Sequence, residues 1–198
     1  MITIYYGMSG ALKETTIKNA PRHENSLKIW SDIKPYWEYR KTLFPEELPG
    51  TDGDFIIQRL LKIKDMAKLY KEGCLSYHNW VIERGVSDMI KCMIDNKTFH
   101  GDDEDIYRII YEEYNLLDNL GLGKPEKLLL VMLDKDFIVD KVLKEPNRKR
   151  YYPDLETYLK KQDEYVEFTK KYNKIKDENV INIHDAYDFI ENIKHLIY

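Results

Sequence analysis

The sequence predicts a three-layer α/β/α fold, in which helices cover both faces of a five-stranded, mostly parallel sheet. Short β-rich runs alternate with helical stretches along the whole chain. The run at 127–133 (KLLLVML) is apolar throughout, as expected of a parallel strand buried on both faces. The chain has 198 residues, of which 43% are hydrophobic, so a single domain spanning 1–198 can bury a core of its own.

The elements of the first half follow from local patterns. Residues 2–6 (ITIYY) form a β-rich run, and a turn of small residues leads from it into the helix-compatible stretch 13–19. Residues 27–31 (LKIWS) predict a second strand, which Pro35 closes and a polar loop follows. Apolar residues recur every three or four positions in 54–71, which predicts a helix.

The second half continues the alternation of strands and helices. Residues 79–82 (NWVI) predict a third strand, and helices are expected at 86–95 and 104–119, before the strand at 127–133. The remaining expected elements are a helix at 136–144, a basic loop at 145–153, a long helix at 154–174, a strand at 179–183 and a helix at 185–196. Ligands of such folds bind beyond the carboxyl ends of the strands, so the residues there are the candidates for function.

The turn after the first strand has the spacing of a phosphate-binding loop. Gly7, Gly10 and Lys13 stand where such a loop presents backbone N–H groups to an anion and extends a lysine to the β- and γ-phosphates. Leu12 replaces a glycine, and Glu14 replaces the hydroxyl residue that usually helps to hold Mg²⁺. An ordinary glycine-containing turn before a helix is the alternative. The residues expected to bind a nucleotide here are Gly7, Ser9, Gly10, Ala11, Leu12, Lys13, Glu14, Thr15 and Thr16.

An acidic residue and an arginine leave the end of the third strand together. The carboxylate of Glu83 can accept a hydrogen bond from a sugar hydroxyl or hold a magnesium-bound water, and Arg84 can bind phosphate or developing negative charge. Asp88 follows in the next helix. A structural ion pair that caps the strand is the alternative.

Three consecutive cations, Arg148, Lys149 and Arg150, lie in the basic loop at 145–153. Such a loop can close over ATP as a lid and stabilise the charge of the transferring phosphoryl group. A solvated basic loop, which is the usual fate of a charge run, is the alternative.

Taken together, Gly7–Thr16, Glu83–Gly85 and Arg148–Arg150, with Tyr158 and Tyr165 in the following helix, resemble the thymidylate kinase and deoxynucleoside kinase family of P-loop kinases. The order and spacing of these motifs cover nearly the whole chain. Glu-Arg-Gly is more similar to the Glu-Arg-Ser of deoxynucleoside kinases than to the Asp-Arg-Tyr or Asp-Arg-His of thymidylate kinases. The resemblance implies transfer of the γ-phosphoryl group of ATP, with Mg²⁺, to a deoxynucleoside or a deoxynucleoside monophosphate.

The resemblance also implies roles for single residues. Asp32 matches the catalytic carboxylate after the second strand, with Glu38 as the second choice, and would accept the proton of the attacking hydroxyl. The other expected catalytic residues are Lys13, Arg84, Arg148 and Arg150. The metal would be held by Thr15 and Glu83, adenine would lie near His184, and the acceptor would lie near Trp37, Phe55, Gln58, Arg59, Glu83, Arg84 and Asp88. For Trp37 and Phe55, stacking on the base and packing in the core are equal alternatives.

Composition narrows the possible partners. The net charge of −4 argues against long nucleic acid as the default partner, because proteins that bind a phosphate backbone usually carry a basic face. Cys74 and Cys92 lack the spacing of a zinc site. No apolar run has membrane-spanning length and the first residues lack the features of a secretion signal, so a cytoplasmic protein is expected.

Three alternatives stay open at this point. A viral-type kinase could act on a hydroxymethylated base within DNA, although the acidic balance argues against it. A protein with the kinase fold could bind nucleotides without turning them over, which Leu12 and Glu14 motivate. A homodimer could form through the apolar faces of 54–71 and 86–95, which burial in the core explains equally well.

Overall fold

The computed structural model describes residues 1–8, 10–20, 24–31, 34–43, 55–73, 79–146 and 152–183. Within these ranges, five strands form one all-parallel sheet in the order β2-β3-β1-β4-β5. The strands are β1 (Ile2–Tyr6), β2 (Ser26–Ile29), β3 (Asn79–Glu83), β4 (Lys127–Leu133) and β5 (Val180–Ile183). The first strand of the chain is therefore the central strand of the sheet, paired with β3 on one side and β4 on the other.

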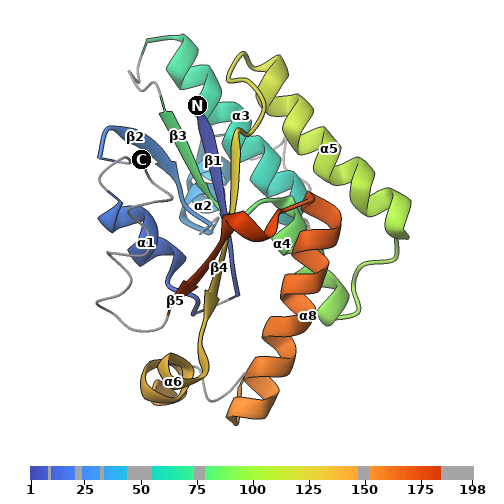
Figure 1. Cartoon of the computed structure of the whole chain (residues 1–198). Coiled ribbons are helices and arrows are strands. Elements are labelled where there is room, and N and C mark those ends of the chain that lie inside the picture. Colours follow the sequence, from blue (N-terminus) through green and yellow to red (C-terminus); the bar gives the residue numbers. More distant parts are fainter. Residues whose placement is uncertain are drawn as a thin grey trace.

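Helices cover the sheet on both faces. The described helices are α1 (Lys13–Asn19), α2 (Lys34–Leu43), α3 (Phe55–Lys71), α4 (Val86–Asp95), α5 (Asp103–Asn119), α6 (Lys135–Phe137) and α8 (Leu155–Asn173), with a π-helical turn η2 (Ile138–Val142) and a 3₁₀ turn η3 (Asp177–Asn179). Helix α1 lies on one face, whereas α3, α4, α5 and α8 pack together on the other (Figure 1). All strands run toward the edge of the sheet where α6 begins (Figure 1).

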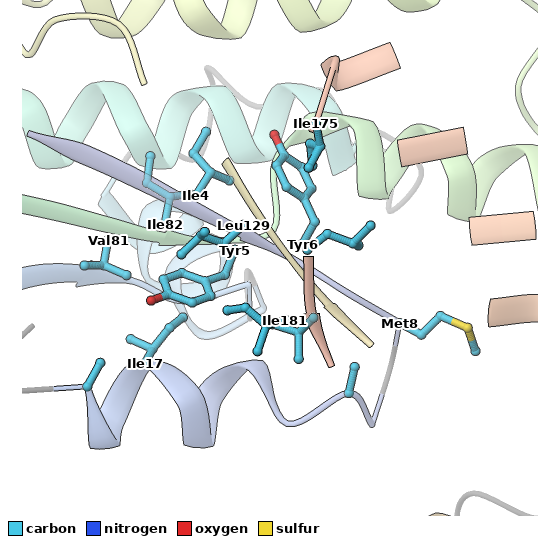
Figure 2. Close-up of a cluster of buried hydrophobic side chains, with 14 of the residues drawn as sticks. Ile4, Tyr5, Tyr6, Met8, Ile17, Val81, Ile82, Leu129, Ile175 and Ile181 are labelled. Atoms are coloured by element: carbon cyan, nitrogen blue, oxygen red, sulfur yellow. The ribbon is translucent and has the colours of Figure 1, made fainter. Parts of the chain in front are cut away.

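The core forms on both sides of β1 because side chains of a strand alternate between its faces. Tyr5 points toward Ile17 of α1, whereas Ile4 and Tyr6 point to the opposite face (Figure 2). All five β1 side chains are buried, as expected for the central strand of a parallel sheet. The apolar composition of β1 is therefore explained by its place in the sheet.

Local signals fix several helix ends. The Asp102 carboxylate accepts a hydrogen bond from the Asp105 N–H, and the Asp105 carboxylate accepts one from the Asp102 N–H, which forms a reciprocal cap at the start of α5. Gln162 of α8 bonds both backbone groups of Leu133 at the end of β4, at 2.9 and 3.1 Å. This amide therefore holds α8 against the sheet.

The expected α/β architecture is confirmed, and the sheet is all-parallel. The expected loop after Pro35 is wrong: α2 occupies Lys34–Leu43, and Pro35 stands in its first turn, where a missing N–H costs nothing. The helix expected at 136–144 is short and continues as the π-helical turn η2. The helix expected at 185–196 and most of the loop at 145–153 lie outside the described residues.

None of the helices in the described ranges is long and apolar enough to cross a membrane.

Candidate active site

The segment after β1 curls into a loop that only glycine permits at its first position. Gly7 has φ +156°, and an added Cβ would lie 2.9 Å from the Val131 carbonyl oxygen of β4. Gly10 has φ +92°, and the Ala11 N–H donates back to the Met8 carbonyl at 3.0 Å. The loop therefore turns sharply at the carboxyl edge of the sheet and leads into α1.

The Lys13 ammonium lies over this loop. It donates to the carbonyl oxygens of Gly7 at 2.6 Å and Met8 at 2.8 Å, and the residue is only 3% exposed. Lys13 is also close enough to Glu83 to lower the pKa of that carboxyl group. A buried cation thus stands beside the loop and faces the end of β3.

The loop accommodates Leu12 and Glu14 in different ways. Leu12 adopts φ +54°, a left-handed conformation that costs a residue with a side chain about 1–2 kcal/mol. Glu14 forms an ion pair with Lys18 one turn along α1 at 2.5 Å, and both side chains are well exposed. The Thr16 hydroxyl donates to the Leu12 carbonyl at 2.8 Å, so it serves the start of the helix.

Glu83 and Arg84 end β3 directly beside the loop. Burial alone would raise the pKa of Glu83, but hydrogen bonds from the Ser31 N–H (3.0 Å) and hydroxyl (2.9 Å), together with Lys13, hold it below its ordinary value. Arg84 has φ +61°, a conformation uncommon for arginine. Its Nε lies 4.0 Å from the Asp88 Oδ2, which is an ion pair but too long for a hydrogen bond.

Arg59 of α3 forms hydrogen bonds to the backbone at the carboxyl ends of β2 and β3. Its guanidinium is fully buried and donates to the carbonyl oxygens of Trp30 (3.2 Å), Glu83 (2.9 Å) and Arg84. Gln58 is also buried. Through these bonds Arg59 joins the carboxyl ends of β2 and β3.

Buried polar side chains, among them Glu113 and Asp88, lie close to Gly85. Glu113 of α5 accepts from the Val86 N–H at 3.1 Å, and burial raises its pKa to about 7. Burial also raises the pKa of Asp88 to about 6, against the attraction of Arg84. A Cβ on Gly85 would lie 2.7 Å from the Tyr6 hydroxyl, which explains why the chain has glycine after Glu83-Arg84.

These parts surround a cleft of about 210 Å³. Its lining residues are Gly10, Leu12, Lys13, Glu14, Thr15, Glu83, Arg84, Phe137, Lys141, Val142 and Glu145. Sequence reasoning did not place Lys141 here. Its position shortly after a strand end, at the carboxyl edge of the sheet, was the signal that could have found it.

The structure thus brings together Gly10, Leu12, Lys13, Glu14, Thr15, Glu83 and Arg84 around one cleft, with Gly7 and Ala11 in the same loop. Asp88 is buried, does not line the cleft, and forms an ion pair with Arg84, which does. Outside the described residues lie Ser9, Asp32, Arg148, Arg150 and His184, together with the side chains of Trp37 and Phe55.

No family model and no curated protein sequence matches the chain. Solved structures do match it over its whole length. A deoxyadenosine kinase from M. mycoides with dCMP and dCDP bound has a TM-score of 0.55 at 15% identity, covering 100% of this chain and 98% of that one. A thymidylate kinase from Ehrlichia chaffeensis has a TM-score of 0.52 at 13% identity, covering 100% and 98%. A shikimate kinase from Bacteroides thetaiotaomicron has a TM-score of 0.54 at 12% identity, covering 99% and 96%.

At these identities the likeness concerns the fold. The chain has the fold of the P-loop kinases, as the resemblance of its motifs implied.

Proposed function

We propose that the chain transfers the γ-phosphoryl group of ATP to a deoxynucleoside or a deoxynucleoside monophosphate. The observation that carries the proposal is the position of Lys13, whose buried ammonium lies on the curled loop after the central strand. Glu83 and Arg84 line the same cleft. The fold shared with deoxyadenosine and thymidylate kinases supports the choice of acceptor.

In the reaction, an acceptor oxygen forms a bond to the γ-phosphorus while the bond to the β,γ-bridging oxygen breaks, and ADP leaves with that electron pair. Lys13 neutralises the β- and γ-phosphates, and Arg84 stabilises charge on the transferring group. Lys141 adds a further cation on the α6 side of the cleft. When the acceptor is a deoxynucleoside, the proton of its attacking hydroxyl passes to a carboxylate, for which Asp32 is the candidate from sequence. When the acceptor is a monophosphate, an ionised phosphate oxygen attacks, and this carboxylate orients the substrate or a metal instead.

The residues of the cleft fit a magnesium ion. Mg²⁺ prefers oxygen ligands, and two residues that line the cleft, Thr15 and Glu83, carry a hydroxyl and a carboxylate. These two residues would hold the ion, directly or through water. When bound, the ion neutralises negative charge on the phosphate oxygens of ATP.

The test is ATP turnover with a panel of deoxynucleosides and their monophosphates. Lys13→Ala should lower kcat by about 100-fold or more, because one charge contact to the transferring group is lost. Lys18→Ala is the matched control, since Lys18 lies on the same helix with its exposed ammonium paired to Glu14. If the wild type phosphorylates no acceptor, or if both variants retain full activity, the proposal is wrong.

A nucleotide-binding protein without turnover is the second candidate. Glu14 favours it, because a glutamate directly after Lys13 offers no hydroxyl to a metal ion, and its carboxylate is paired with Lys18. Calorimetric titration with ATP distinguishes the two candidates. ATP binding that Lys13→Ala abolishes, in a wild type that transfers no phosphate, would support this second function.

A further inference from the structure

One tyrosine hydroxyl connects the phosphate loop with two helices. Tyr165 lies on α8, and its hydroxyl accepts a hydrogen bond from the Gly7 N–H at 2.8 Å. The same hydroxyl donates to the Asp88 Oδ1 on α4. Both bonds are buried, so water does not replace them.

The partners of Tyr165 distinguish it from a tyrosine that is merely buried. Gly7 is the first residue of the loop and has a backbone conformation that side chains disfavour. Asp88 in turn faces Arg84, with Oδ2 and Nε 4.0 Å apart. Neither of these two atoms has a hydrogen-bond partner among the described residues, so each is directed chiefly at the other.

A continuous connection therefore runs from the Gly7 N–H through Tyr165 and Asp88 to Arg84. Its two ends are the loop that would hold the ATP phosphates and the cation that would stabilise the transferring group. The middle of the connection is the Tyr165 hydroxyl, which belongs to α8, a helix that does not line the cleft. Besides the bonds of Lys13 to the loop and of Arg59 to the Arg84 carbonyl, this connection is a direct side-chain link between the loop and Arg84.

We propose that Tyr165 is a positioning residue, which sets the spacing between the phosphate loop and Arg84 through its bonds to Gly7 and Asp88. This proposal rests on the function proposed above. Without the hydroxyl, the Gly7 N–H loses its acceptor and Asp88 loses a donor that favours its ionised form. Asp88 then binds a proton more readily, and its attraction for Arg84 weakens.

Other groups also act on Asp88 and are unchanged by the loss of this hydroxyl. The charged and titratable groups that face it are Arg84, Lys13, Arg59, Glu113 and Tyr6. Because they come from the other elements around Asp88, a variant of Tyr165 isolates the contribution of α8.

The test compares Tyr165→Phe with Tyr172→Phe. Tyr172 lies two turns further along α8, and its hydroxyl also donates to an aspartate, Asp103, at 2.5 Å, but neither residue lines the cleft. Each variant therefore loses one tyrosine–aspartate bond on the same helix. The measurements are kcat and KM for ATP, the Kd of ADP by calorimetry, and the pH profile of kcat/KM.

We expect Tyr165→Phe to lower kcat/KM by about ten-fold or more, to weaken ADP binding, and to move the acidic limb of the profile to higher pH. Tyr172→Phe should change none of these by more than about two-fold, and its unfolding midpoint should fall less than that of Tyr165→Phe because Asp103 is exposed to water. Equal effects of the two variants on kcat/KM, ADP affinity and the acidic limb would overturn the positioning role. A wild type that transfers no phosphate would instead refute the proposed function, and the ADP affinities of the two variants would then decide this proposal.

Discussion

Replacing Glu113 by glutamine should remove a pH-dependent loss of stability. The Glu113 side chain is fully buried on α5, and its Oε2 accepts a hydrogen bond from the Val86 N–H at 3.1 Å. Its Oε1 has no hydrogen-bond partner among the described residues. Burial raises the pKa of Glu113 from 4.5 to about 7, although the Arg59 guanidinium acts in the opposite direction. The ionised form is therefore less favourable in the folded protein than in the unfolded chain.

The magnitude follows from the two pKa values. Raising the pKa from 4.5 to about 7 corresponds to about 3 kcal/mol, at about 1.4 kcal/mol for each pH unit. Because the folded pKa is the higher one, this stability is fully present below about pH 4.5 and is lost as the pH rises through about 7. Between about pH 5 and about pH 8 the wild type should lose about 2 kcal/mol that the glutamine variant keeps.

Urea unfolding followed by tryptophan fluorescence at these two pH values measures the difference. The free energy of unfolding of Glu113→Gln, relative to wild type, should rise by about 2 kcal/mol from the lower to the higher pH, or by about 4–8 °C in Tm. Glu112→Gln is the control, since Glu112 is the exposed neighbour on the same helix, and its difference from wild type should stay constant. A Glu113→Gln difference that does not change with pH would refute the reasoning.

Three further predictions concern the loop, the end of β3 and the docking of α8. The free energy of unfolding of Leu12→Val, measured in urea, should be about 1–2 kcal/mol lower than that of Leu12→Gly, because a β-branched residue is disfavoured at φ +54°. The similar sizes of valine and leucine alone would predict the opposite order. Gly85→Ala should destabilise by about 1–3 kcal/mol, since its Cβ would lie 2.7 Å from the Tyr6 hydroxyl, and addition of Tyr6→Phe should recover part of that loss in a double-mutant cycle. Gln162→Leu should cost about 2 kcal/mol or more and speed hydrogen exchange at the Leu133 amide, because both backbone groups of Leu133 lose their partner, and unchanged exchange would contradict this.

The parts of the fold that depend on neighbours in sequence could be predicted from sequence. The β-rich run of 2–6 indicated β1, the apolar run of 127–133 indicated that β4 is buried on both faces, and the apolar period of 54–71 indicated α3. The glycines and Lys13 indicated the curled loop, because their spacing is a local property of the backbone. Helix α2 was missed because Pro35 was taken to end the preceding strand, whereas a proline is equally at home in the first turn of a helix.

The contacts between distant residues could not be predicted in this way. Nothing near Arg59 in the sequence indicates that its guanidinium binds carbonyl groups at the ends of two strands. Glu113 lies in a helix rich in acidic residues, most of them exposed, and only the packing of α5 shows that this one is buried. The bond between Gly7 and Tyr165 joins residues 158 positions apart, so it depends on the folded arrangement of α8.

The central place of β1 has a consequence for how the protein is made. This strand is synthesised before both of its partners, which end at Glu83 and Leu133. At about 5–20 residues per second, the synthesis of the chain from β1 to the end of β4 takes roughly 6 to 25 seconds, during which the ITIYY segment lacks at least one of its partners. An unpaired strand can pair with strands of other nascent chains and aggregate. The yield of soluble protein should therefore rise when chaperones shield the segment until β3 and β4 emerge, and when expression at a lower temperature slows aggregation.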